Sequence, residues 1–252
     1  MVRNNHFESN RKKLDELLRP EGCSNDMATL RRLLEYAETM ASIENSIVVI
    51  SDMSDGKSHI VAGEFARSLG LHGYRLENSI WEKRILALMP QEELEEKYIN
   101  ELRFFHFVRH LPKDRKSQFH LMSKLRFRFV DGSVRDVLHR MHYIYDDSNC
   151  NVRYALCIYS PLLFDFKCRS LIVNSATGVT EEISSSNSEN ILSKRERQVL
   201  ALIDNGMKSA EIADLLNISI HTVSRHRQEI ISKLQVKNTH EACRLAKSMA
   251  LI

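Results

Sequence analysis

The chain has 252 residues, of which 43% are hydrophobic and 27% are charged, and its formal net charge is +3. This composition is ordinary for a globular protein, and the length allows two modest domains. No run approaches the roughly 18–20 apolar residues that a membrane-spanning helix needs. The first residues carry charges without an apolar core, which argues against a secretory signal. We therefore expect a cytoplasmic protein without a membrane segment.

The five cysteines favour a reducing compartment. Their number is odd, and none of them has the CxxC spacing of a zinc or redox site. We expect reduced, mostly buried thiols and no metal site, with a redox sensor as the alternative interpretation. The cysteines are Cys23, Cys150, Cys157, Cys168 and Cys243.

Residues 1–45 are predicted to be helical, and residues 46–183 to form an α+β domain. Apolar residues at helical spacing predict a helix over Ala28–Glu44, which we regard as a candidate for dimer contacts. Two short apolar runs, at 46–51 and 58–62, flank the turn-rich segment DMSDGK and predict a hairpin. Helical patterns follow, interrupted near Gly70 and Gly73, and a further helix is expected over Glu92–Arg109.

Three antiparallel strands are predicted next, over 120–130, 133–145 and 152–159. The first two are joined by Asp131-Gly132, a strong hairpin signal between β-rich runs. A small terminal hairpin is expected from 169–174 and 179–183. Strands, then helices, then strands indicate an α+β domain with an antiparallel sheet rather than alternating βαβ units. The apolar-free segment SSSNSEN (184–190) is the predicted linker to a second domain, residues 191–252.

The second domain has the local signals of an all-α helix-turn-helix unit. Ser193 and Glu196 have the spacing of a capping box, and Gly206 is expected to end that helix. A second helix is predicted from Ser209 to about Leu216, and Ser219 should begin the third. Residues 190–252 hold ten Lys/Arg against six Asp/Glu, a positive excess that favours a nucleic-acid partner.

The third helix can be divided into faces at 100° per residue. With Val223 at zero, Ile230 and Leu234 fall on the same side and define the core. The residues predicted to reach base edges point away from this side: Ser224, Arg225 and Gln228. The residues predicted to contact the DNA backbone are Lys208, Thr222, His226, Arg227 and Lys233. For His226 and Arg227 a structural role inside the domain remains an open alternative.

These residues together resemble the LuxR-type helix-turn-helix over about residues 191–250. The matching positions include Leu192-Ser193, Arg195-Glu196, Val199-Leu200, Gly206, Glu211-Ile212-Ala213, Leu216, Ile218-Ser219, Thr222-Val223, His226, Ile230 and Lys233-Leu234. The resemblance implies four helices, the last over about 240–250 and often used in dimerisation, and binding to inverted half-sites. Lys208 replaces a common Ser or Thr, and Ser224 and Gln228 stand where many members carry Lys, so no operator sequence is inherited.

The first domain resembles a PAS domain over about residues 46–160. The resemblance rests on the two early strands, on Trp81 shortly before Met89-Pro90, and on the phrase FRFVDGSVRDVLHRMHYIYDD. No motif for a phospho-receiver, an ATPase or a flavin photoreceptor accompanies it, and we expect no cofactor. His139 and His142, of opposite strand parity, are expected in the core or on the surface rather than as haem ligands. The basic residues of 113–128 are expected to form a solvated face of the sheet, with binding of an anion or DNA as the alternative.

The sequence therefore predicts a transcription regulator and not an enzyme. It would bind double-stranded DNA as a homodimer, under the control of a partner or an unidentified small-molecule ligand at the first domain. An adaptor that binds a ligand or protein, and whose helix-turn-helix no longer reads DNA, is the alternative. A small-molecule enzyme in the first domain would need a pocket with paired titratable groups.

Overall fold

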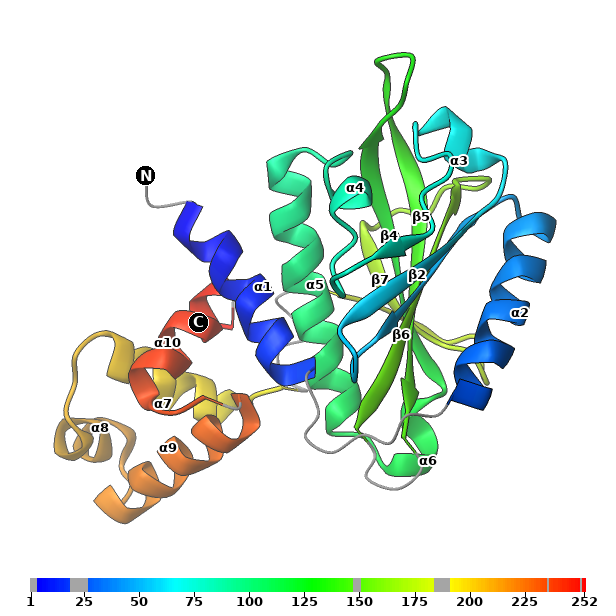
Figure 1. The fold of residues 1–252 in the computed structure, drawn as a ribbon. Coiled ribbons are helices and arrows are strands. Elements are labelled where there is room, and N and C mark those ends of the chain that lie inside the picture. The colour runs from blue at the N-terminus through cyan, green and yellow to red at the C-terminus, as the bar shows by residue number, and fades with distance from the viewer. Residues whose placement is uncertain (1–3, 19–26, 147–150, 184–190, 235, 250) are drawn as a thin grey trace. The chain divides into compact units, whose positions relative to one another are not determined.

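The computed structural model describes residues 4–18, 27–146, 151–183, 191–234, 236–249 and 251–252 (Figure 1). The chain divides into two compact units. One unit combines residues 12–98 and 111–182, and we call it the sheet unit. The other combines residues 1–11, 99–110 and 183–252, and it contains the four C-terminal helices. The predicted linker, residues 184–190, lies outside the described residues.

A single antiparallel sheet forms the centre of the sheet unit, in the order β3-β2-β1-β6-β5-β4-β7-β8. The strands are β1 (Ile47–Asp52), β2 (Lys57–Ala62), β3 (Leu76–Glu77), β4 (Phe119–Arg128), β5 (Val134–Tyr145), β6 (Val152–Pro161), β7 (Ser170–Asn174) and β8 (Thr180–Glu182). All three predicted groups of strands are confirmed. The sequence did not predict how they join: β1 pairs with β6, and β4 pairs with β7, so that the separate hairpins form one sheet.

The helices upstream of residue 117 are α1 (Asn4–Leu18), α2 (Met27–Ile43), α3 (Phe65–Ser68), α4 (Lys83–Leu86), α5 (Gln91–Arg109) and α6 (Lys113–Lys116). The helices predicted over 28–44 and 92–109 are confirmed as α2 and α5. The interrupted helical patterns near Gly70 and Gly73 correspond to single turns, because both glycines adopt positive φ angles.

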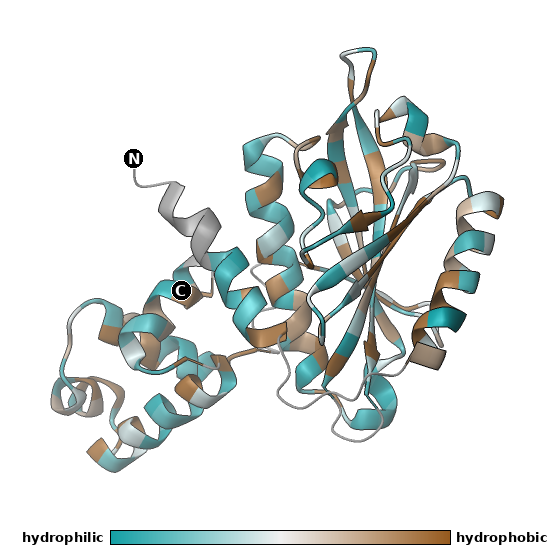
Figure 2. Ribbon diagram, viewed as in Figure 1, coloured by the Kyte–Doolittle hydropathy of each residue, from teal (hydrophilic) through white to brown (hydrophobic). Residues whose placement is uncertain are grey.

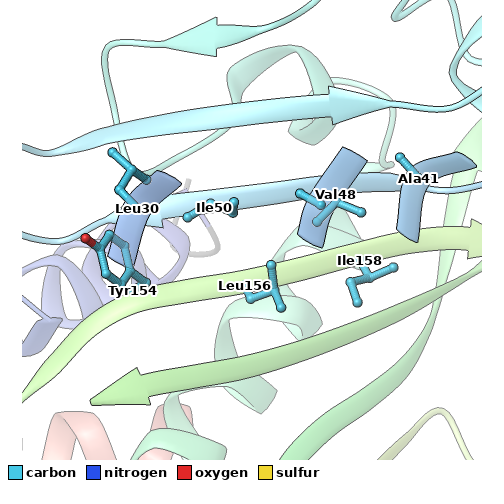
Figure 3. Close-up of a cluster of buried hydrophobic side chains, with 8 residues drawn as sticks. Leu30, Ala41, Val48, Ile50, Tyr154, Leu156 and Ile158 are labelled. Carbon is cyan, nitrogen blue, oxygen red and sulfur yellow. The ribbon is translucent and has the colours of Figure 1, made fainter. Parts of the chain in front are cut away.

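Helix α2 packs its apolar side onto the sheet (Figure 3). Three of its residues meet alternate residues of β1 and β6, which point to one face of the sheet because successive strand residues alternate. The cluster consists of Leu30, Ala37, Ala41, Val48, Ile50, Tyr154, Leu156 and Ile158. The main apolar stripe of this helix is therefore occupied within the chain, and its use in dimer contacts stays a prediction. Met27, Tyr36 and Ile43 remain exposed.

The opposite face of the sheet is also buried and includes polar side chains. The imidazole of His139 is fully buried and stacks on the ring of Tyr159, with ring centroids 4.8 Å apart. Neither ring nitrogen of His139 has a hydrogen-bond partner in the described part of the chain. Burial lowers the pKa of His139 well below its usual range, and the nearby Lys97 lowers it further. His139 is therefore a neutral imidazole whose polar atoms are unsatisfied.

His142 points to the α2 side of the sheet, as its opposite parity predicted. It stacks on His120 with ring centroids 4.5 Å apart, and His120 Nδ1 lies 2.9 Å from the hydroxyl of Ser175. Burial lowers the pKa of His142 to about 4, and the nearby His120 and Arg140 act in the same direction. Burial also lowers the pKa of His120. Two imidazoles thus pack as neutral rings on this face.

The basic residues of 113–128 differ in exposure: four are exposed, Lys116 is half-buried and Lys124 is buried. Lys124 Nζ lies 2.7 Å from Asp165, and Arg126 Nε donates to the buried Glu93 of α5 at 2.6 Å. Lys116 lies over the ring of Tyr145. The predicted solvated face is wrong for Lys124, which is buried by its contacts, whereas Arg126 stays exposed although it pairs with Glu93.

Three of the cysteines lie within the described residues. Cys157 and Cys243 are buried, Cys168 is half-buried, and all three are free. Cys23 and Cys150 lie outside the described residues. Within the described ranges, no three His, Cys, Asp or Glu side chains gather as a metal site, and none of the helices is long and apolar enough to cross a bilayer.

Candidate DNA-binding interface

The C-terminal helices are α7 (Lys194–Asp204), α8 (Ser209–Leu216), α9 (Ile220–Leu234) and α10 (Thr239–Ser248). The predicted capping box begins α7: the hydroxyl of Ser193 accepts from the backbone N–H of Glu196, and the Glu196 carboxylate accepts from the Ser193 N–H at 2.6 Å. Gly206 follows the helix with φ +83°, as its role in ending the helix requires.

Helices α8 and α9 are joined by the predicted turn. Asn217 adopts the left-handed conformation with φ 52°, and the Leu216 carbonyl accepts from the Arg195 guanidinium at 2.7 Å. Ser219 then begins α9, because its hydroxyl accepts from the Thr222 backbone N–H at 3.0 Å. The turn is therefore held by side-chain bonds at both of its ends.

The predicted division of α9 into faces is confirmed on its core side. Val223, Ile230 and Leu234 are fully buried. Hydrophobic and hydrophilic residues alternate along this helix in Figure 2, as expected for a helix with one packed side. With its core side fixed, the remaining side of α9 faces away from the domain interior.

The residues predicted to read bases lie on that outer side. The side chain of Arg225 is 66% exposed, Gln228 is exposed, and Ser224 is half-buried. Arg can bind guanine O6 and N7 with two hydrogen bonds, and Gln can bind adenine N6 and N7 in the same way. The three side chains lie in the first half of the helix, where a recognition helix reaches base edges.

Three of the residues predicted to contact the DNA backbone border this surface. Thr222 lies in the first turn of α9, with its hydroxyl 2.9 Å from that of Ser219. Lys208 is exposed immediately before α8, and its backbone N–H donates to Glu211 at 2.6 Å. His226 is only 13% exposed, and its Nδ1 lies 3.4 Å from Glu229. Thr222 and Lys208 are thus the more accessible of the three.

The other two predicted backbone contacts, Arg227 and Lys233, have partners inside the domain. Arg227 donates to the hydroxyls of Ser209 in α8 and Thr239 in α10, at 2.9 and 3.1 Å. Lys233 Nζ lies 2.7 Å from Glu196, whose carboxylate is almost fully buried. Burial opposes ionisation of Glu196, but the hydrogen bonds from Lys233 and Ser193 outweigh it and lower the pKa of Glu196. Both cations therefore connect helices.

We expect Arg227→Met to destabilise the C-terminal helices by about 1–2 kcal/mol, because two hydrogen bonds from a charged donor are lost. Urea unfolding followed by far-ultraviolet circular dichroism measures this change. The matched control is Arg244→Met, which removes an exposed cation from α10. Unchanged stability, together with a weaker salt dependence of DNA binding, would instead identify Arg227 as a phosphate contact.

Comparison with known proteins identifies this part of the chain. Residues 190–246 match the family model described as bacterial regulatory proteins, luxR family. The C-terminal domain is a LuxR-type helix-turn-helix domain. Its four helices and the confirmed core of α9 agree with what the sequence resemblance implied.

Curated relatives match about a third of this chain. The oxygen regulatory protein NreC of Staphylococcus epidermidis is 36% identical over 91 residues, which are 35% of this chain and 42% of that protein. NreC of Staphylococcus carnosus is 34% identical over 90 residues. The chain thus spans less than half the length of the relatives that it matches.

Solved structures align with most of the chain, but at low similarity. The phage VqmA–DPO complex covers 89% of this chain and 90% of its own, with 16% sequence identity and a TM-score of 0.33. Escherichia coli SdiA covers 98% of both chains, with 14% identity and a TM-score of 0.25. At these scores neither structure establishes a shared fold for the whole chain.

Three further residues of the LuxR-type domain border the candidate surface and were missed by the sequence analysis. Ile220 is 55% exposed at the first position of α9, and His221 follows it, also exposed. The helical projection places His221 near 160°, between Gln228 and Arg225, so the same projection could have found it. Glu229 contacts both Arg225 and His226. These two contacts of Glu229 depend on side-chain positions, which the sequence pattern does not reveal.

Proposed function

We propose that the chain is a sequence-specific DNA-binding transcription regulator, with α9 as its recognition helix. The observation that carries this proposal is the exposure of Arg225 and Gln228, with Ser224 half-buried beside them, on the outer side of a helix whose opposite side packs into a LuxR-type core. We propose these three as base contacts, and Lys208, Thr222 and His226 as backbone contacts. For Arg227 and Lys233 we propose a scaffold role, because both are engaged within the domain.

We infer that the sheet unit is a PAS-like sensor domain that modulates DNA binding. Its antiparallel sheet with helices inserted between β2 and β4 supports the resemblance. The unsatisfied His139 supports a ligand, since a buried polar atom without a partner is costly and a bound molecule could supply one. A small molecule carrying a hydrogen-bond donor or acceptor would suit this imidazole. Native mass spectrometry should then show a non-covalent adduct that is absent in His139→Phe.

Selection of duplexes from a random DNA library by the full chain tests the DNA-binding proposal. We expect enrichment of an inverted repeat, because a symmetric dimer presents two recognition helices to two half-sites. Analytical ultracentrifugation on the selected duplex should show two chains per DNA. If no sequence is enriched, the adaptor interpretation gains; a strict monomer on the duplex would contradict the proposed homodimer.

A further inference from the structure

One carboxylate on α9 contacts two of the side chains proposed to meet DNA. Arg225 Nε lies 3.4 Å from Glu229 Oε1, and His226 Nδ1 lies 3.4 Å from Glu229 Oε2. The contact with His226 is close without being a hydrogen bond. Glu229 therefore forms an ion pair with Arg225 one helical turn away and packs beside His226.

The position of Glu229 is unexpected for a surface that binds DNA. On the helical projection it falls near 240°, between Arg225 near 200° and His226 near 300°. A negative charge there repels phosphate and weakens binding to every sequence, since phosphate contacts supply most of the sequence-independent affinity. Glu229 therefore lowers the affinity for DNA of any sequence, compared with an uncharged residue at the same position.

We propose that Glu229 is a positioning residue that sets the sequence selectivity of Arg225. An exposed ion pair is weak, so Arg225 can exchange Glu229 for another acceptor. Non-specific DNA offers single phosphate oxygens at varied positions, whereas guanine offers O6 and N7 in the fixed geometry that a guanidinium matches. Glu229 contacts Nε of Arg225, and the two Nη groups remain for guanine O6 and N7. Glu229 thus competes with phosphates for Arg225 and orients it for guanine. This inference rests on the proposed DNA-binding function.

The test variant is Glu229→Gln, which keeps the size of the side chain and removes its charge. We expect binding to random duplex to tighten about fivefold at low salt, and the salt dependence to steepen by about one phosphate contact, because Arg225 becomes available to the backbone. Binding to the selected duplex should gain less, because the contact that orients Arg225 for guanine is lost there. The ratio of the two affinities, the specificity, should therefore fall.

Two controls separate positioning from bulk charge. Asp214→Asn removes an exposed carboxylate from α8 of the same domain. Glu229→Gln is also made in an Arg225→Ala background, as a double-mutant cycle. We expect Glu229→Gln to tighten binding to random duplex more than Asp214→Asn does. In the Arg225→Ala background, Glu229→Gln should tighten binding only as much as Asp214→Asn. Circular dichroism checks that each variant is folded.

The outcomes distinguish this inference from the proposed function. An effect equal to that of Asp214→Asn, or one that persists undiminished without Arg225, overturns the positioning role and leaves DNA binding intact. If the unmodified chain selects no sequence, the proposed function itself fails, and the inference fails with it. Selective binding by the unmodified chain, with reduced selectivity in Glu229→Gln, supports both.

Discussion

Replacing Arg225 and Gln228 together by alanine is expected to abolish the preference for a selected duplex over random DNA. A good bidentate contact to a base contributes about 1–3 kcal/mol of discrimination, so losing two should cost roughly 2–6 kcal/mol. Both side chains are exposed, so their removal should leave the α9 core intact. Binding to random DNA should change far less, because phosphate contacts carry it.

Fluorescence anisotropy with the selected and a scrambled duplex measures this discrimination. Arg244→Ala is the matched control, because it removes one exposed cation from α10 without touching α9. The single variants then assign the two bases: losing Arg225 should relax the preference at a guanine, and losing Gln228 at an adenine. Selectivity that survives in the double variant would show that other residues, such as the exposed His221, read the sequence.

Acidification from pH 7 to pH 4.5 is expected to destabilise the sheet unit by several kcal/mol. The pKa of His142 falls from about 6.5 in the unfolded chain to about 4 in the fold. Unfolded His142 therefore binds a proton that the folded form excludes, and stability falls as the pH drops from about 6.5 towards 4. This residue alone contributes roughly 2–3 kcal/mol at pH 4.5. His139 and His120 act in the same direction, since burial lowers the pKa of each.

Urea unfolding at the two pH values, followed by Trp81 fluorescence, measures this effect. Trp81 is the single tryptophan of the chain and packs on Tyr98 within the sheet unit, with ring centroids 5.2 Å apart. His142→Gln should reduce the difference between the two pH values, whereas His72→Gln, at an exposed position, should not. An equal pH difference in all three proteins would contradict neutral packing of His142.

Protonation of carboxylates changes stability at a lower pH than protonation of imidazoles, so the two effects can be measured separately. A side-chain hydrogen bond from Lys124 lowers the pKa of Asp165. The stability that this pairing contributes is present above the unfolded pKa of about 4 and is lost below it. Destabilisation that appears between pH 6.5 and 4.5 is therefore expected from the imidazoles and not from this ion pair.

The sequence by itself determined the C-terminal domain almost completely. Its signals are local: Ser193 and Glu196 are three residues apart, and the side of α9 that carries Val223 and Ile230 follows from helical geometry. The strands of the sheet unit, apart from the two-residue β3, were also predicted, because alternation and turn residues act over short spans. Where a few neighbouring residues determine the backbone conformation, the sequence pattern was sufficient to predict the helix or strand.

The tertiary structure alone decided how distant residues pair. The joining of β1 to β6 brings together residues about 100 positions apart, and no local pattern specifies such a partner. The same holds for Arg227 and Lys233, whose bonds to Ser209 and Glu196 link different helices. Charge and helical angle placed both cations near the DNA-facing surface. Only the positions of their partners indicate that the two are used to hold the domain together.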